Sequence, residues 1–386
     1  MKKSMFTSLH ILGNNLSHDS RVLKETESIL KLSECENLFI AALHEPGYLN
    51  QEVMDGRHVW RPNLLTRKLP KSILFQILKY IEWNLKIFFK YHNTQINIIH
   101  CHDLIPLPIA VQLKLACGAK LIYDAHELET EMNGLLGTRK LLAKILEFTL
   151  YPFVDQLITV SPSIGRWYEK KYKKIPIEIV RNVPLRNTRP VNLELNLRRD
   201  LGIDNNCVFF IYLGGLSKGR GIEVILDSFA DFRVKHHVLF MGSGILEPKV
   251  NDAAKHYHNI HFRKPVPVEE IVPYAACADV GLCLYEDTCL NHRFCMPNKL
   301  FEYLLSGLPV LASNLPDLSE LVLNYSSGWI SQPTSDAVKS LLVNLSLEEV
   351  KHIRQGLANR VSTLSWESEE KKLCNVYKSL LNSVSR

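Results

Sequence analysis

The chain has 386 residues, more than one hydrophobic core usually covers, so we expect two domains. Hydrophobic residues make up 46% of the sequence and charged residues 22%, which excludes a disordered or fibrous protein. The formal net charge of +6 suits a phosphorylated ligand or an anionic membrane surface. This charge is too small to argue for nucleic acid as a partner, and no motif for nucleic-acid binding occurs.

The nine cysteines include no C-x-x-C pair, which favours reduced thiols and a cytoplasmic protein. Cys277, Cys283, Cys289 and Cys295 are evenly spaced, but this spacing is not typical of a zinc site, so we expect no metal there. No apolar run approaches the ~20 residues of a spanning helix.

Residues 5–12 are predicted to form the first strand, followed by Gly13 and Asn14. A glycine after a first strand lets a ligand approach the backbone closely, so both residues are candidates for ligand binding. The next run begins with residues that favour helix caps and is predicted to become helical at about Arg21. A further strand is expected over residues 38–43.

Residues 64–92 predict an amphipathic helix with a basic face. Two interpretations stay open, because such a helix can lie on an anionic membrane or pack on a sheet with its lysines in water. The apolar face consists of Leu74, Ile77, Leu78, Ile81, Leu85, Phe88 and Phe89, and the basic face of Lys71, Lys79, Lys86 and Lys90.

Residues 96–127 predict two parallel strands joined by a helix over about residues 105–116. His102 and Asp103 follow the first strand, and Asp124 and His126 follow the second. Ligands bind at this edge in open α/β sheets, so these side chains are candidates for a site. A histidine at a strand end is also often only structural, so the residues alone leave the role of His126 open.

Strands are next expected over residues 156–160 and 177–180, with a helix opening at Ser161 between them. The stretch up to about residue 197 is rich in Asn, Arg and Pro and reads as a linker. We therefore expect an N-terminal domain over residues 1–190, a C-terminal domain over residues 191–365 and a terminal helix over residues 366–386.

The second half opens with a predicted strand over residues 208–213 and a glycine-rich loop. Amide groups of Gly214 and Gly215 can cradle phosphate before a helix, and Lys218 and Arg220 add positive charge. Another predicted strand, 238–241, ends at Gly242 without a G-x-G-x-x-G motif, so we do not expect NAD. Further strands are expected over residues 260–262, 280–285 and 328–330.

Residues 297–305 predict a short helix that starts at Pro297 and is ended by Gly307, with a buried strand over 310–312. Glu302 lies about one turn into this helix. Free amides at the helix start can bind phosphate, and a carboxylate one turn on can accept two hydroxyls, which together match a nucleotide. Glu302 on a solvated surface is the alternative.

Residues 293–321 resemble the C-terminal signature of retaining glycosyltransferases of the family-4 type (glycosyltransferase group 1), which have the GT-B fold. Glu302 stands at the second glutamate of that signature, and residues 306–310 form its small-Gly-x-Pro-Val turn. Phe294 stands where the family has its first glutamate. The resemblance extends from about residue 17 to the terminal helix, and it implies an α/β protein with two Rossmann-like domains facing a central cleft.

The resemblance implies a nucleotide-sugar site in the C-terminal domain, with Glu302 on the ribose. It places Arg220 and the amides near Asn298 and Lys299 on the diphosphate. Gly215 stands where the family has an arginine, so Lys218 is a candidate substitute. The other donor-binding residues that we expect are Gly13, Asn14, Gly214, Gly242, Val266, Met296 and Pro297.

The resemblance also implies an acceptor site in the N-terminal domain. It places His126 beside the transferred sugar, as a catalytic residue together with Arg220 and Glu302. Arg21 and Asp103 are expected to face the acceptor.

The expected function is metal-independent hexosyl transfer, with retention, from a nucleotide sugar to a glycan or lipid-linked acceptor in surface polysaccharide assembly. UDP is favoured over GDP, and the absence of Asp-x-Asp argues against a bridging metal, so no cofactor is expected. The basic helix would place the protein at the inner face of the membrane. The alternatives are a non-catalytic nucleotide-sugar-binding or partner protein, motivated by Phe294 and Gly215, and an epimerase or inverting transferase on the same fold.

Overall fold

The computed structural model describes residues 5–17, 19–185 and 196–384 and divides into two units. One unit comprises Met1–Arg181 and Glu369–Arg386, and the other comprises Asn182–Ser368. The C-terminal helix α16, Trp366–Val384, thus adds most of its length to the first unit. The domain boundary that we expected at residues 190 and 191 lies outside the described residues.

The first unit is built on an eight-stranded sheet in the order β3-β4-β2-β1-β5-β6-β7-β8. All neighbouring strands are parallel except β3 and β4. Continuous apolar runs form the central strands, which are buried, as the sequence predicts for a parallel sheet. The strands are β1 Phe6–Ile11, β2 Cys35–Ala41, β3 Gln51–Met54, β4 Arg57–Trp60, β5 Ile98–His102, β6 Lys120–Ala125, β7 Gln156–Thr159 and β8 Ile177–Ile179.

The hairpin of β3 and β4 was not predicted, although the sequence carries its signal. Asp55 and Gly56 connect the two strands with φ values of 47° and 83°. An Asp-Gly pair with positive φ at both positions is the preferred two-residue hairpin turn.

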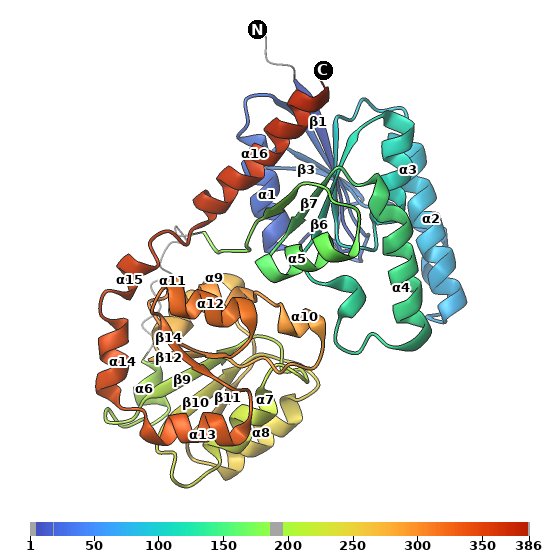
Figure 1. Ribbon diagram of the computed structural model, residues 1–386. Coiled ribbons are helices and arrows are strands. Elements are labelled where there is room, and N and C mark those ends of the chain that lie inside the picture. The colour runs from blue at the N-terminus through green and yellow to red at the C-terminus, as the bar shows by residue number, and fades with distance from the viewer. Residues whose placement is uncertain (1–4, 18, 186–195, 385–386) are drawn as a thin grey trace. The chain divides into compact units, whose positions relative to one another are not determined.

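Helices cover both faces of this sheet, with α2, α3 and α4 on one side and α1 and α16 on the other (Figure 1). Tyr377 of α16 is buried and its hydroxyl lies 2.9 Å from His100 Nδ1, which ties the C-terminal helix to the sheet. The α-helices are α1 Ser20–Leu30, α2 Ile73–Tyr91, α3 Leu107–Cys117, α4 Gly137–Leu150 and α5 Pro162–Lys171, and the 3₁₀ turns are Leu65–Lys68, Glu129–Glu131 and Tyr151–Phe153.

Helix α2 begins later than the sequence predicts, at Ile73, after a separate turn at Leu65–Lys68. It buries only Trp83, Asn84, Ile87 and Tyr91. Most of the apolar face that we defined from the sequence is therefore exposed. Within the described part of the chain, no helix has the length and apolar character to span a membrane.

The second unit contains a six-stranded parallel sheet in the order β11-β10-β9-β12-β13-β14. The two largely parallel sheets confirm the α/β class. The strands are β9 Phe209–Leu213, β10 His237–Met241, β11 Ile260–Arg263, β12 Val280–Cys283, β13 Val310–Ser313 and β14 Gly328–Ser331. The helices are α6 Leu197–Asp200, α7 Ile222–Phe229, α8 Glu247–His256, α9 Val268–Ala276, α10 Leu290–Arg293, α11 Asn298–Leu305, α12 Pro316–Asn324, α13 Ser335–Asn344, α14 Leu347–Arg354 and α15 Leu357–Arg360.

Helix α11 carries Glu302 and is fixed to the sheet by Tyr303. The Tyr303 hydroxyl accepts a hydrogen bond of 2.8 Å from the Leu213 N–H, and its ring covers Gly281 of β12. The helix begins at Asn298, one residue later than predicted, and Pro297 is its N-cap rather than its first residue. Gly307 follows the helix with φ 75°, the left-handed conformation that the sequence predicts.

We expect Gly281→Ala to lower the free energy of unfolding by about 1–3 kcal/mol, because overpacking forces neighbouring groups to move. A Cβ at this position would lie 2.3 Å from Cγ of Tyr303. Urea unfolding measures the effect. Gly13→Ala is the control, since its Cβ would meet Ile105 at an ordinary 3.6 Å. Equal stability of the two variants would show that Tyr303 shifts at no cost.

Candidate active site

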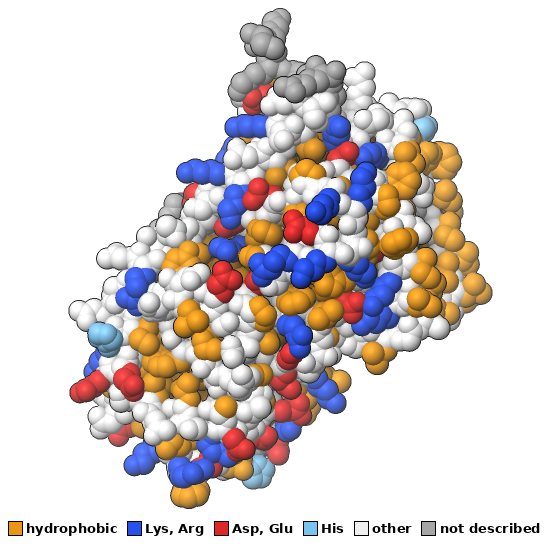
Figure 2. All heavy atoms as spheres, viewed as in Figure 1, with side chains coloured by type: hydrophobic (Ala, Val, Ile, Leu, Met, Phe, Trp, Pro, Cys, Tyr) orange, Lys and Arg blue, Asp and Glu red, His pale blue; other side chains and the backbone are white. Residues whose placement is uncertain are grey.

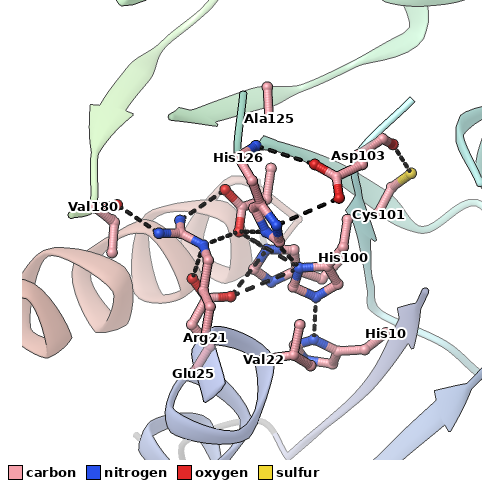
Figure 3. A network of polar contacts seen from close by, with 12 residues as sticks. His10, Arg21, Val22, Glu25, His100, Cys101, Asp103, Ala125, His126 and Val180 are labelled. Carbon is pink, nitrogen blue, oxygen red and sulfur yellow. Dashed lines mark hydrogen bonds and ion pairs between the residues drawn. The ribbon is translucent and has the colours of Figure 1, made fainter. Parts of the chain in front are cut away.

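In the first unit, ionisable side chains converge where β1, β5 and β6 end. Helix α1 adds Arg21 and Glu25 from the opposite side of the cluster (Figure 3). These side chains touch one another through hydrogen bonds and ion pairs, and almost all are buried. The strands and the residues directly after them contribute His10, His100, His102, Asp103, Asp124 and His126.

His126 lies between two carboxylates at the edge of this cluster. Its Nε2 lies 3.1 Å from Asp124 Oδ2 and its Nδ1 lies 3.4 Å from Asp103 Oδ2. Its backbone N–H donates to Asp103 Oδ1 at 3.2 Å. Burial alone would lower the pKa of His126, but Asp103 and Asp124 raise it to about 10. With 19% of its side chain exposed, His126 presents a positive charge at the surface of the cluster.

Asp103 is the more exposed of the two carboxylates, with 34% of its side chain accessible. Its φ of 67° lies in the left-handed region, which few residues other than glycine and asparagine or aspartate adopt. Held this way, its carboxylate faces His126. Non-glycine residues in such conformations are enriched at functional sites.

Arg21 does not occupy the position that we expected, because its guanidinium is buried rather than directed at an acceptor. Its Nε and Nη2 donate to the two carboxylate oxygens of Asp124 at 3.1 and 2.8 Å, and its Nη1 donates to the Val180 carbonyl at 2.8 Å. Although burial opposes ionisation, Arg21 and His126 hold the pKa of Asp124 well below its usual value. Arg21 therefore fixes Asp124, and Asp124 in turn fixes His126.

Beneath His126, three further histidines form a buried stack that sequence analysis did not identify as a cluster. His102 Nδ1 lies 3.3 Å from His126 Nε2, and His102 Nε2 lies 3.0 Å from His10 Nδ1. The rings of His100 and His102 stack with centroids 4.3 Å apart. Burial lowers the pKa of all three, and for His102 the value falls to about 3. The available signal was the H-x-H alternation in β5, which puts both side chains on one face of a strand.

Gly13 and Asn14 lie at the same edge of the first sheet. The Asn14 amide donates to Asp19 Oδ2 at 2.8 Å, and Asp19 caps α1 by accepting from the Val22 N–H. Burial acts to raise the pKa of Asp19, but His126 and the Asn14 hydrogen bond lower it below the usual value. Both residues belong to the unit that holds His126, and their contact with a donor stays a prediction.

The second unit carries the glycine loop at the end of β9. Gly214 has φ 114°, and a Cβ on Gly242 would lie 1.9 Å from the Gly214 carbonyl oxygen. Only glycine at position 242 permits this approach of two backbones. The Tyr212 hydroxyl donates to the Gly215 carbonyl at 2.9 Å, which fixes the next residue of the loop.

Two cations flank this loop. Lys299, in the first turn of α11, is 6% exposed, and its Nζ lies 3.5 Å from the centre of the Tyr212 ring. That Nζ would lie 3.9 Å from a Cβ on Gly214, and it has no hydrogen-bond partner among the described residues. Arg220 Nη1 would lie 3.2 Å from a Cβ on Gly215, so its guanidinium occupies the space of the missing side chain. Lys218, our expected substitute, is exposed.

The remaining predicted donor residues surround α11 or follow β11 in the same unit. Glu302 is half-buried on α11, Asn298 is exposed at its start and Met296 is buried before it. Val266 is half-buried after β11, and Phe294 is half-buried at the end of α10. The second unit thus brings Gly214, Gly215, Gly242, Arg220 and Lys299 together, whereas His126, Asp103 and Arg21 belong to the first unit.

Two largely parallel α/β units, with a glycine loop and cations in one and a histidine–carboxylate cluster in the other, agree with the GT-B glycosyltransferase class that the resemblance implies. Two family matches agree with this class. Glycosyltransferase Family 4 matches residues 37–183, and Glycosyl transferases group 1 matches residues 208–346. The chain therefore belongs to the group 1, family-4 type of glycosyltransferases and is a transferase enzyme, as the sequence predicts.

Similar proteins and solved structures agree with this family. A Candida albicans chitobiosyldiphosphodolichol β-mannosyltransferase is 25% identical over 370 residues, 86% of this chain and 78% of that protein. A Salmonella typhimurium lipopolysaccharide 1,2-N-acetylglucosaminetransferase is 23% identical over 229 residues, 55% and 59% of the two chains. The structure of sucrose-phosphate synthase from Thermosynechococcus elongatus has a TM-score of 0.79 at 15% identity, covering 98% of this chain and 100% of that one. Anabaena Alr3699/HepE in complex with UDP and glucose has a TM-score of 0.70 at 14% identity, covering 97% and 100%. These structures show the GT-B fold.

Proposed function

We propose that the protein is a retaining hexosyltransferase that moves a sugar from a nucleotide sugar to a hydroxyl of a glycan or lipid-linked acceptor. The observation that carries this proposal is the pair of cations, Arg220 and Lys299, beside the Gly214–Gly215 loop. In such a transfer, negative charge develops on the departing diphosphate. Cations already fixed at that place stabilise the charge without reorganisation.

Lys299 supports an anionic ligand in particular. A buried ammonium group that lacks a hydrogen-bond partner is costly, and a diphosphate oxygen would supply both charge and acceptor. The faces of Tyr212 and Tyr285, 3.5 and 5.6 Å from Nζ, attract the cation in the free protein. We therefore assign the diphosphate to Lys299, Arg220 and the loop amides, without a bridging metal, and the ribose hydroxyls to Glu302.

We favour a UDP-sugar over a GDP-sugar as the donor. The support is the Anabaena HepE structure, which is solved with UDP and glucose and shares this fold. For the acceptor, the Candida relative is named for a diphosphodolichol substrate and the Salmonella relative for lipopolysaccharide. Both names support a lipid-linked or glycan acceptor in the assembly of a surface polysaccharide.

We assign the sugar and the acceptor hydroxyl to His126 and Asp103. The positive charge of His126 attracts the hydroxyl oxygens of a sugar, and the exposed Asp103 carboxylate accepts a hydrogen bond from a hydroxyl. Arg21 acts through Asp124 as a positioning residue.

Inverting transfer is the second candidate. It is favoured by the two relatives named β-mannosyltransferases, because a β-linked product from an α-linked donor requires inversion. Phe294, in place of the first glutamate of the family signature, also distinguishes this chain from the retaining pattern.

We further propose that the first unit docks on an anionic membrane through α2 and α4. Figure 2 shows hydrophobic side chains gathered over the side of the unit that α2, α3 and α4 cover. Among the described residues, α4 buries only Glu147, which accepts hydrogen bonds from Tyr123, Tyr168 and Tyr172. The exposed apolar side chains are Ile73, Leu74, Ile77, Leu78, Ile81, Leu85 and Phe89 of α2, and Leu141, Leu142, Ile145 and Phe148 of α4.

Charge favours a membrane over a purely apolar partner. Lys71 and Lys90 are exposed beside or on α2, and Arg139 is exposed on α4. Exposed apolar side chains next to lysine and arginine match the surface of anionic lipid. Apolar patches of this kind are uncommon on a monomer that has no partner there. A protein bound to the membrane through this surface would lie close to a lipid-linked acceptor.

We expect a nucleotide diphosphate to stabilise the protein against heat, and Lys299→Met to weaken that binding by roughly 10- to 150-fold, the effect of losing a hydrogen bond to a charged group. Glu302→Ala should weaken it as well. Thermal shifts with UDP, GDP, ADP and CMP, each with and without EDTA, provide the measurement. Ligand at ~100 times its dissociation constant stabilises by about 2.7 kcal/mol.

Lys218→Met is the matched control, because this lysine is exposed in the same loop. It should leave the nucleotide-induced shift nearly unchanged, and EDTA should not alter that shift. If Lys218→Met weakens binding as much as Lys299→Met, the donor site is wrongly placed. If no nucleotide binds, both hypotheses fail: the transferase and the non-catalytic nucleotide-sugar-binding protein.

We expect the product to keep the anomeric configuration of the donor sugar. Proton NMR of the anomeric signal during the first turnovers measures this configuration directly. An inverted signal would replace retention by the second candidate while leaving transfer itself established.

We expect the protein to sediment with vesicles that contain phosphatidylglycerol and to be released by salt, which screens surface charge. Leu141→Glu combined with Ile145→Glu should abolish sedimentation, because both side chains are exposed on α4.

Phe232→Glu is the control for this experiment, since Phe232 is 92% exposed but belongs to the second unit. Unchanged sedimentation of the α4 variant would contradict membrane docking at this surface. Dimers of the wild type that the α4 variant loses would identify a second copy of the chain as the occupant instead.

A further inference from the structure

Four buried side chains of the first unit place one potential metal-ligand atom each close together. These side chains are Glu25 of α1, His100 and His102 of β5, and Asp124 of β6. Their ligand atoms all lie within 4.8 Å of one another. None of the four was identified from the sequence as a metal ligand, because they come from three elements far apart along the chain.

Four separations between these atoms approach those around a four-coordinate cation. His102 Nδ1 and His100 Nε2 lie 3.5 and 3.6 Å from Asp124 Oδ2. The same nitrogens lie 3.9 and 3.8 Å from Glu25 Oε2. Zinc bonds to nitrogen and oxygen of about 2.0–2.2 Å give ligand–ligand separations of about 3.3–3.6 Å in a tetrahedron. A contraction of a few tenths of an ångström on the Glu25 side would bring both histidine–Glu25 separations into this range.

Unsatisfied polar atoms provide an independent reason to expect a ligand there. Among the described residues, Oε2 of Glu25 and Nε2 of His100 are buried without a hydrogen-bond partner. Arg21 Nε forms an ion pair with Glu25 Oε1 at 3.0 Å, whereas Oε2 faces the histidine nitrogens. Buried polar atoms are nearly always paired, so an unpaired oxygen and nitrogen that face each other at 3.8 Å call for a bridging group.

The outer contacts of the two histidines also suit metal ligation. The other ring nitrogen of His100 lies 2.9 Å from the Tyr377 hydroxyl, and that of His102 lies 3.0 Å from His10 Nδ1. Ligating histidines almost always use their second nitrogen in this way, which fixes the ring and its tautomer. The Tyr377 hydroxyl also lies 3.2 Å from His10 Nε2, so one side chain of α16 supports both rings.

We propose that Glu25, His100, His102 and Asp124 bind a divalent transition-metal cation of the zinc class. Imidazole nitrogen with carboxylate oxygen is a ligand set that suits zinc, whereas magnesium and calcium prefer oxygen alone. All four ligands come from the protein and are buried, which is the arrangement of a structural site. Such a cation would replace the 3.3 Å contact between His102 Nδ1 and His126 Nε2, and the stacked rings of His100 and His102 would turn to share it. The bound cation would join α1 to the sheet. The proposal is independent of the donor site in the second unit.

The first test is the metal content of the full-length protein, purified without chelators and measured by mass spectrometry. We expect about one zinc ion per chain, the content of a single closed site. Glu25→Gln and His100→Ala should lose it, and His58→Ala, which removes an exposed histidine of the same unit, should retain it. Glu25→Gln keeps the shape of the side chain, so its circular dichroism separates loss of metal from loss of fold.

The second test uses protein that has been stripped with a strong chelator. Added zinc should raise the melting temperature of the wild type and not that of Glu25→Gln. Cobalt should give a tetrahedral visible spectrum without thiolate charge-transfer bands, which excludes the nine free cysteines as ligands.

The proposal is overturned if the purified protein holds no stoichiometric metal and the stripped protein does not respond to zinc. It is also overturned if Glu25→Gln and His100→Ala bind as much metal as the wild type. The shift that nucleotides induce should survive chelation, so failure of this proposal is distinguishable from failure of the donor site.

Discussion

The ion pair between Arg21 and Asp124 is the contact on which the candidate site of the first unit depends. It joins the first helix to the central sheet at the edge where three strands end, and a third hydrogen bond reaches the Val180 carbonyl. Removing one partner of a buried pair leaves an uncompensated charge, which typically costs 3–5 kcal/mol. The pair therefore keeps Asp124 ionised and in place, and Asp103 and Asp124 together hold His126 in position and raise its pKa.

The two units differ in how their buried charged groups are paired. In the first unit, positive and negative groups neutralise one another inside the cluster, and only His126 and Asp103 retain partial exposure. In the second unit, Lys299 is buried against tyrosine faces without a hydrogen-bond partner among the described residues. In the function that we propose, the neutralised cluster binds the sugar and the acceptor hydroxyl, and the buried cation binds the diphosphate.

Sequence patterns predicted most of the strands and helices, because periodicity reports which residues share a face. They did not report what covers a face, so the sequence left α2 open between an anionic membrane and the sheet. The structure shows that most of its apolar side chains are exposed. The burial of Arg21 was not predictable for a related reason, since its partners Asp124 and Val180 are more than a hundred residues away. Lys299 was expected to contribute its amide, and only the fold shows its side chain beside Gly214. The Asp55-Gly56 hairpin, by contrast, was readable and was missed.

Gly215 and Phe294 both depart from the family signature, but they do not weaken the proposed transferase function equally. A diphosphate requires positive charge at a point in space, and the sequence position of the residue that supplies it is secondary. Arg220 extends into the volume that a side chain at position 215 would fill, and Lys299 approaches the same loop from α11. In the donor site that we propose, these two cations take the place of the missing arginine, which a comparison of motifs does not detect. Phe294 offers neither charge nor a hydrogen-bond acceptor where the family has a glutamate, so we expect the chemistry of this chain to differ from that of its family at this position.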